Sequence, residues 1–261
     1  MATHTAPILD RILESRRAWV AELKARERTG GLPYGGSEPT RDFRGALTGP
    51  NVALIAECKE RSPSGGVLQQ AYDPVLLARR YSANGASAIS VLTEPDFFGG
   101  SLAHLNPIRA AVDLPLLCKD FIIDPVQVRA ARSAGADALL LIVGILDNDT
   151  LRTLHASATE LGMQVVVEVH NETEVRRAVD LDAAMIGINN RDLTKMKTDK
   201  TTTARLRPLI PADRAVISES GIGSRADIDE LARLNVDAAL VGESLLRAAD
   251  LDAKVRELSG R

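Results

Sequence analysis

The sequence predicts an α/β fold, a (β/α)8 TIM barrel with an N-terminal helical extension, and two observations support this prediction. From residue 51 onward, short apolar strands alternate with amphipathic helices through eight units. Strict alternation gives a parallel sheet, and eight units in roughly 210 residues close naturally into a barrel. Similar phrases also recur, as in ANGASAISVL, SAGADALLLI and LNVDAALVG. We therefore expect one barrel domain over residues 1–261, with residues 1–50 as the extension.

Each predicted strand is a short apolar run that ends in polar residues. The first run, Val52 to Ala56, is continuously apolar, as expected of strands that are covered on both faces. The eight predicted strands lie near residues 52–57, 88–92, 115–119, 138–142, 164–168, 184–188, 214–218 and 238–241.

Helical spacing of apolar residues fills the gaps between these strands. The predicted helices lie around residues 73–84, 103–112, 124–134, 148–161, 171–179, 201–208, 224–234 and 243–258. Residues 7–26 are predicted to form a further amphipathic helix, which would be a lid or a plug across one barrel end. Trp19 in this helix is expected to pack in the core. The turn-rich segment 31–47 is expected to wrap the surface.

A doubly wound open sheet is the competing fold. That fold normally carries a G-x-G-x-x-G motif after an early strand, and none follows the first strand here.

Composition limits the partners and the compartment. The net charge is −3 with mixed signs along the chain, so no nucleic-acid partner is expected. No apolar run approaches the ~20 residues of a membrane span, and Cys58 and Cys118 lie in apolar runs as small buried side chains. We expect a cytoplasmic monomer that binds a small molecule and needs neither a cofactor nor a metal ion, since the histidines lack ligand spacing.

Polar residues at the carboxyl ends of the strands are the candidate site, because barrel enzymes carry their catalytic groups there. Any one of them could be a structural ion pair, but five of the eight strands show the same pattern. The residues are Glu57 and Lys59, Lys119 and Asp120, Glu168 and His170, Asn189 to Asp192, and Ser218 to Gly221. A lone histidine such as His170 is more often a surface side chain with its hydrogen bonds already made, or a residue next to the catalytic groups, than a catalytic group itself.

Glycine turns after the last two strands indicate a phosphate site. Ser220 to Gly223 follows the seventh strand and Gly242 follows the eighth. Backbone N–H groups in these two loops often bind phosphate in barrels.

Seven stretches then carry a family resemblance. IAECKERSPSGG, ISVLTEPDFFGGS, LPLLCKDFIID, VVVEVHNETE, IGINNRDL, ISESGI and LVGESLL resemble, in order, the strand motifs of indole-3-glycerol phosphate synthases, from about residue 8 to the C-terminus. The resemblance implies conversion of 1-(2-carboxyphenylamino)-1-deoxyribulose 5-phosphate to indole-3-glycerol phosphate, carbon dioxide and water. It identifies the chain as a lyase, a decarboxylase of tryptophan biosynthesis.

The resemblance also implies roles for individual residues. Lys119 matches the general acid and Glu168 the general base, while Lys59 contacts anionic groups of the substrate and shares the acid role as an open alternative. We expect desolvation or a nearby cation to lower the pKa of Lys119. Of the remaining matches, Glu57 and Glu219 are orienting carboxylates, and Asn189 belongs to the catalytic set through a polar contact with the substrate. The other substrate contacts are Ser62, Phe98, Phe121, Leu140, Arg191 and Leu193, and the phosphate residues are Ser220, Gly221, Gly242 and Glu243.

Three other functions remain open at this point. Two strand-end lysines suit a Schiff-base aldolase, a sugar-phosphate isomerase would use a similar barrel, and a noncatalytic phosphate-metabolite sensor would show no turnover.

Overall fold

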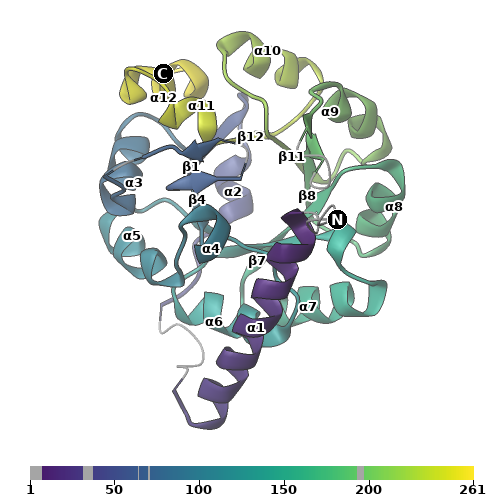
Figure 1. Ribbon diagram of the computed structural model, residues 1–261. Helices are drawn as coiled ribbons and strands as arrows, with labels where there is room; N and C mark the ends of the chain where they lie inside the picture. Colours follow the sequence, from purple (N-terminus) through teal and green to yellow (C-terminus); the bar gives the residue numbers. More distant parts are fainter. Residues whose placement is uncertain (1–7, 32–37, 64, 70, 193–196) are drawn as a thin grey trace, which may run out of the picture.

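The strands form a closed parallel barrel in the order β1-β12-β11-β8-β7-β6-β5-β4 (Figure 1). The computed structural model describes residues 8–31, 38–63, 65–69, 71–192 and 197–261. The eight predicted strands are confirmed, and each end lies within one residue of its predicted position. The barrel strands are β1 (Ala53–Cys58), β4 (Ala88–Leu92), β5 (Leu116–Lys119), β6 (Ala138–Ile142), β7 (Gln164–Val169), β8 (Met185–Asn189), β11 (Ala215–Glu219) and β12 (Ala238–Val241).

An outer ring of helices covers the barrel. Most begin at a side chain that caps the first turn, as Asp73 does by accepting hydrogen bonds from the N–H groups of Val75 and Leu76. The helices are α3 (Pro74–Ala83), α5 (Leu105–Ala111), α6 (Pro125–Ser133), α7 (Asn148–Glu160), α8 (Glu172–Asp180), α9 (Thr201–Leu206), α10 (Arg225–Arg233) and α12 (Leu251–Ser259).

The last predicted helix, 243–258, is wrong as a single element. It is divided into α11 (Glu243–Leu246) and α12, because Asp250 adopts an extended conformation and its side chain begins a new helix by accepting from the N–H of Ala253. Short elements also occur that the periodicity does not predict. They are α4 (Pro95–Phe98), η1 (Leu102–His104), η2 (Val143–Ile145), η3 (Arg207–Leu209), and the hairpins β2 (Arg61–Ser62) with β3 (Gly66–Val67) and β9 (Arg191–Asp192) with β10 (Lys197–Thr198).

The two faces of the barrel strands contribute to two different apolar clusters. Ile55, Leu117 and Val166 pack together inside the barrel. Leu54 and Cys58 point to the other face and join the layer beneath the outer helices, because successive side chains alternate across a strand. Both cysteines are free and buried, as predicted.

The helix α2 (Phe43–Leu47) closes the amino-terminal end of the barrel. Phe43 and Leu47 are fully buried against interior residues that begin the strands, such as Ala88 and Ala138. The expectation that residues 31–47 only wrap the surface is therefore wrong for this helix, because two large apolar side chains at helical spacing seal the barrel.

The helix α1 (Ile8–Arg28) lies at the opposite end of the barrel; in Figure 1 its first turns lie in front of the barrel, and the rest passes over α6 and extends beyond the ring of helices. Ile12 is buried in the interior cluster that also contains Phe121 and Ile142. The helix thus lies near the carboxyl ends of the strands, as a lid would. Within the described ranges no helix is long and apolar enough to cross a membrane.

Candidate active site at the carboxyl end of the barrel

A cavity of about 410 Å³ opens at the carboxyl ends of the strands. Its polar walls come from residues that follow interior positions by two: Glu57 after Ile55, Lys119 after Leu117, and Glu168 after Val166. Strand alternation therefore turns each of these charged side chains inward at the rim. All but one of the predicted site residues that the structure describes line this cavity; Leu193 lies outside the described residues. The exception is Glu219, which is buried behind the lining and reaches the site through its ion pair with Lys119. The lining includes Glu57, Lys59, Ser62, Phe98, Lys119, Phe121, Leu140, Glu168, Asn189, Arg191, Ser220, Gly221, Gly242 and Glu243.

Lysines and carboxylates alternate across the floor of the cavity. The ammonium of Lys119 pairs with the carboxylate of Glu219 and lies 3.8 Å from Oε2 of Glu57. Lys59 pairs with the other oxygen of Glu57. Because Glu57 and Glu219 are buried, these contacts are screened little by solvent. Groups from β1, β5 and β11, which are far apart in sequence, thus form one network.

The pKa of Lys119 is raised, so the expectation of a lowered value is wrong for the ligand-free protein. Burial by itself would lower this pKa, but the carboxylates of Glu219, Glu57 and Glu168 outweigh burial. Lys119 is therefore an ammonium at neutral pH, a proton donor rather than a free amine.

The three carboxylates have different protonation preferences. Burial would raise the pKa of Glu57, yet Lys59 and Lys119 hold it below the usual value. For Glu168, burial is likewise outweighed by His170 and Lys119, and its pKa is lowered. Burial, reinforced by Glu168 and Glu57, raises the pKa of Glu219 to about 7 in spite of Lys119. Glu57 and Glu168 are thus ionised at neutral pH, whereas Glu219 exchanges a proton near neutral pH.

Gly187 on β8 makes room for the carboxylate of Glu219. A Cβ at this position would lie 2.5 Å from Oε1 of Glu219 and 3.1 Å from Cγ1 of Val166. The absence of a side chain therefore lets Glu219 reach across the barrel to Lys119.

The predicted phosphate turns lie together at one side of the cavity. Ser220 and Gly221 both have positive φ, at 69° and 82°, which turns the chain sharply after β11. Gly242, directly after β12, leaves room for the Glu57 side chain of the neighbouring strand β1, since a Cβ there would lie 2.4 Å from Oε1 of Glu57. The two loops are joined by Ser244, whose hydroxyl donates to the carbonyl of Ile222 at 2.8 Å.

Two arginines flank this side of the cavity. The Oε2 atom of Glu243 lies 3.5 Å from Nη2 of Arg191, and its Oε1 atom lies 3.0 Å from Nε of Arg247. Arg247 also donates to the carbonyl of Gly65 at 2.9 Å, and the N–H of Gly65 donates to Ser62. Sequence reasoning missed Arg247, which could have been found from its position four residues after Glu243 on a helical turn.

An apolar wall faces the charged groups. The rings of Phe98 and Phe121 have centroids 6.1 Å apart and both border the cavity with Leu140. Apolar residues that were not predicted extend this wall: Leu92, Ile142, Ile222, Leu240 and Val241. They lie in strands or follow them, and in the sequence an apolar residue there looks the same whether it packs in the core or lines a cavity. A planar aromatic group fits this lining.

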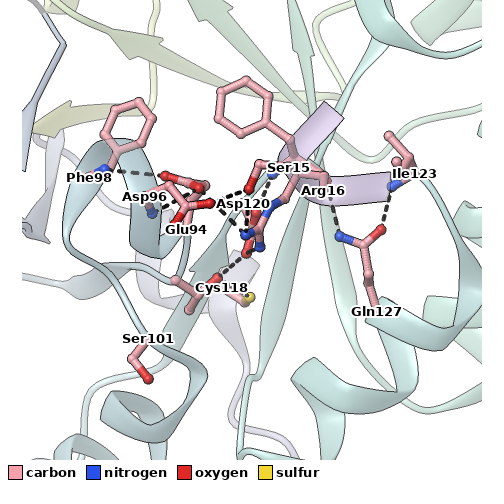
Figure 2. Close-up of polar contacts among 12 residues, drawn as sticks. Ser15, Arg16, Glu94, Asp96, Phe98, Ser101, Cys118, Asp120, Ile123 and Gln127 are labelled. Atoms are coloured by element: carbon pink, nitrogen blue, oxygen red, sulfur yellow. Dashed lines mark hydrogen bonds and ion pairs between the residues drawn. The ribbon is translucent and has the colours of Figure 1, made fainter. Parts of the chain in front are cut away.

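Arg16 joins α1 to the loops that carry these groups (Figure 2). Its buried guanidinium lies 3.5 Å from Oε1 of Glu94 and 3.6 Å from Oδ2 of Asp120. Glu94 caps α4, accepting from the N–H of Phe98 at 3.2 Å, and Asp120 follows Lys119. The helix α1 is therefore tied to both the aromatic wall and the lysine strand.

The fold and the cavity define a (β/α)8-barrel enzyme with acid and base groups at the strand ends. The family model described as indole-3-glycerol phosphate synthase matches residues 9–258. The chain belongs to the indole-3-glycerol phosphate synthase family.

Individual relatives agree with this assignment. The chain is 50% identical to the indole-3-glycerol phosphate synthase of Roseiflexus sp. (strain RS-1), over 97% of this chain and 98% of that protein. It is 49% identical to the protein of the same name from Dehalococcoides mccartyi (strain CBDB1), over 94% of this chain and 95% of that protein.

A solved structure, 3-hexulose-6-phosphate synthase from Salmonella typhimurium, has a TM-score of 0.66 at 19% identity, over 80% of this chain and 97% of that one. At this identity the likeness concerns the fold alone.

Proposed function

We propose that this chain converts 1-(2-carboxyphenylamino)-1-deoxyribulose 5-phosphate to indole-3-glycerol phosphate, carbon dioxide and water, as a carboxy-lyase of tryptophan biosynthesis. One observation carries the proposal: an ammonium, Lys119, and an ionised carboxylate, Glu168, border one cavity beside an aromatic wall. Ring closure needs a proton donor, dehydration needs a proton acceptor, and the benzoate ring needs an apolar surface.

The first step forms the carbon–carbon bond. The ring carbon that bears the carboxylate attacks the ketone carbon, and the electron pair of the C=O bond moves to oxygen. Lys119 donates a proton to this oxygen as charge develops on it. Its pairing with Glu219 holds the ammonium in place for this role. Lys59 lies in the same cavity, so it remains the alternative donor.

Loss of carbon dioxide and water follows. The C–C bond to the carboxylate breaks, and its electron pair restores the aromatic ring. The hydroxyl then leaves as water with a second proton, which comes from Lys59 or from Lys119 after solvent has reprotonated it. Glu168 removes a proton from the neighbouring CH2 group of the new ring, and this completes the indole. Overall one proton is consumed, since the departing carboxylate carried one negative charge.

The remaining residues bind and orient the substrate. We assign Glu57, Glu219 and Asn189 to orienting the lysines and the sugar hydroxyls, and Ser62, Phe98, Phe121, Leu140 and Leu193 to contacts with the substrate. Arg191 suits an anion because its planar fork donates two parallel hydrogen bonds. The phosphate is assigned to the turns of Ser220, Gly221, Gly242 and Glu243, with Glu243 using its N–H group.

A Schiff-base aldolase fits the cavity less well. Imine formation needs an uncharged amine, but Lys59 and Lys119 are both paired with carboxylates. Borohydride added with substrate would trap a covalent lysine adduct if that chemistry occurred.

The assay for the proposal follows indole fluorescence after addition of the carboxyphenylamino sugar phosphate. Product formation coupled to one equivalent of carbon dioxide supports the synthase. Absence of turnover, with tight substrate binding, would support the sensor instead.

We also propose that residues 1–261 form one barrel domain with residues 1–50 as its N-terminal extension, and that the protein is a cytoplasmic monomer. A molecular mass of 28.0 kDa in sedimentation equilibrium is the result expected of a monomer.

A further inference from the structure

His170 lies between two carboxylates just beyond the end of β7. Its Nε2 atom is 3.2 Å from Oε1 of Glu168, and its Nδ1 atom is 3.1 Å from Oε2 of Glu174. A neutral imidazole has only one N–H group, so it can donate to only one of these carboxylates. Both ring nitrogens face a carboxylate, and this favours the imidazolium: Nδ1 forms a hydrogen bond with Glu174, and Nε2 forms an ion pair with Glu168.

Glu174 is itself held firmly at the start of α8. It accepts from the backbone N–H of His170 at 2.8 Å and from the side-chain amide of Asn171 at 2.7 Å. The second carboxylate is therefore fixed before any ligand binds. Burial would lower the pKa of His170, but Glu168 and Glu174 together raise it to about 10.

Glu168 is surrounded by groups from several strands. Lys119 approaches from β5, Asn189 from β8 and Glu219 from β11, while His170 approaches from behind the strand end. Burial and the neighbouring Glu219 favour the protonated form of Glu168, whereas Lys119 and His170 favour its carboxylate. In the proposed reaction Lys119 gives up a proton, which leaves His170 as the cation that stays beside Glu168.

We propose that His170, held by Glu174, is a positioning residue that keeps Glu168 ionised and fixes the direction of its carboxylate. His170 does not border the cavity, so it acts through Glu168 rather than on the substrate. The inference rests on the proposed function in so far as Glu168 is taken as the base.

A purely structural role is the competing explanation. His170 and Glu174 lie at the beginning of α8, where Asn171 caps the helix by accepting from the N–H of Glu174. A helix-capping role alone would change the melting temperature when His170 is replaced, but it would leave the pH dependence of turnover unchanged.

The first test compares the pH dependence of kcat in the wild type, His170→Gln and Glu174→Gln. Glutamine can still donate a hydrogen bond but carries no charge. We expect the apparent pKa of the acidic limb of the kcat profile to be higher by about one pH unit in His170→Gln. At pH values below this limb, kcat should then be about tenfold lower than in the wild type. KM at the optimum should stay within about twofold. Glu174→Gln leaves His170 protonated at acidic pH, so it should move this limb by less than His170→Gln does.

The matched control is His155→Gln, because His155 lies on α7 and does not border the cavity. Its profile should overlay that of the wild type. An unshifted limb in His170→Gln would overturn the proposal. If that variant does not fold, the charge of His170 in the wild type, measured by NMR as described next, decides.

The second test does not depend on activity. Nitrogen-15 NMR of the histidine side chains, with His170 assigned from the His170→Gln spectrum, should show an imidazolium up to at least about pH 8. The midpoint should fall in Glu174→Gln. A neutral His170 ring at pH 7.5 would refute the ion pair even in an active enzyme, whereas an inactive wild type with a charged His170 would refute only the proposed function.

Discussion

The guanidinium of Arg16 lies 3.6 Å from the carboxylate of Asp120, the residue that follows Lys119. Both side chains are about 1% exposed. Burial raises the pKa of Asp120 in spite of Arg16 and of the hydrogen bond from Thr93 at 2.7 Å. The helix α1 therefore supplies the positive charge that accompanies a buried carboxylate next to the proposed acid.

Replacement of Arg16 should destabilise the protein. Arg16→Met leaves Asp120 and Glu94 buried without their cation, and removal of one partner from a buried ion pair costs about 3–5 kcal/mol. Urea unfolding should show this loss of free energy. Arg17→Met, on the exposed face of the same helix, should change stability by less than about 0.5 kcal/mol. A loss below about 1 kcal/mol for Arg16→Met would contradict the assigned role.

Removal of residues 1–31 should raise KM more than it lowers kcat. The deletion removes Ile12 and Arg16 from the rim but keeps α2, which a deletion through residue 45 would disrupt. The wall of Phe98 then loses its support, while Lys119 and Glu168 remain on their strands. Steady-state kinetics would measure both constants, and an unchanged KM would limit α1 to a structural role.

Lys119→Met and Glu168→Gln should each lower kcat by at least about 10²-fold, the scale of losing a general acid or base. Product fluorescence under saturating substrate measures this directly. Lys24→Met, on the exposed part of α1, is the matched control and should retain activity. Near-normal turnover of either active-site variant would remove that residue from the mechanism, and a larger loss in Lys59→Met than in Lys119→Met would make Lys59 the principal donor.

Gly187→Ala should impair both stability and turnover. The added methyl group would lie 2.5 Å from the Glu219 carboxylate, which must then move away from Lys119. Overpacking of this kind costs about 1–3 kcal/mol. Gly49→Ala is the control, since no atom lies within 4 Å of the added methyl group. Equal kinetics and stability for the two variants would show that β8 shifts to accommodate the methyl group at little cost in free energy.

Glu219→Gln should change how stability depends on pH. The pKa of Glu219 is raised in the folded protein from 4.5 to about 7, so between these values the folded state binds more protons than the unfolded state. Stability of the wild type, relative to the glutamine variant, should therefore fall as the pH rises through this window. The loss is roughly 3 kcal/mol in total.

Urea unfolding of both proteins from pH 5 to pH 8 tests this. The exposed replacement Glu160→Gln should keep a constant difference from the wild type. A constant difference for Glu219→Gln as well would mean that Glu219 titrates at the same pH in both states.

Local patterns were sufficient for the barrel and for most of the site. Apolar runs such as Val52 to Ala56 and the capping residue Asp73 act over a few residues, so strand and helix positions followed from the sequence. The period of two along a strand also fixed which residues face inward, because Glu57 follows Ile55 by two. The division at Asp250 and the burial of α2 did not follow, since they depend on packing against distant elements.

The sequence by itself determined the order of strands and helices, the inward direction of Lys119 and Glu168, and the family, because each depends on short-range spacing or on motifs. Only the tertiary structure decided the charges. The pKa of Lys119 is raised rather than lowered because carboxylates from three other strands converge on it, and His170 is an imidazolium because the turn into α8 brings Glu174 to its second nitrogen. Electrostatic energy depends on distances across the barrel, and those distances are set by strand closure.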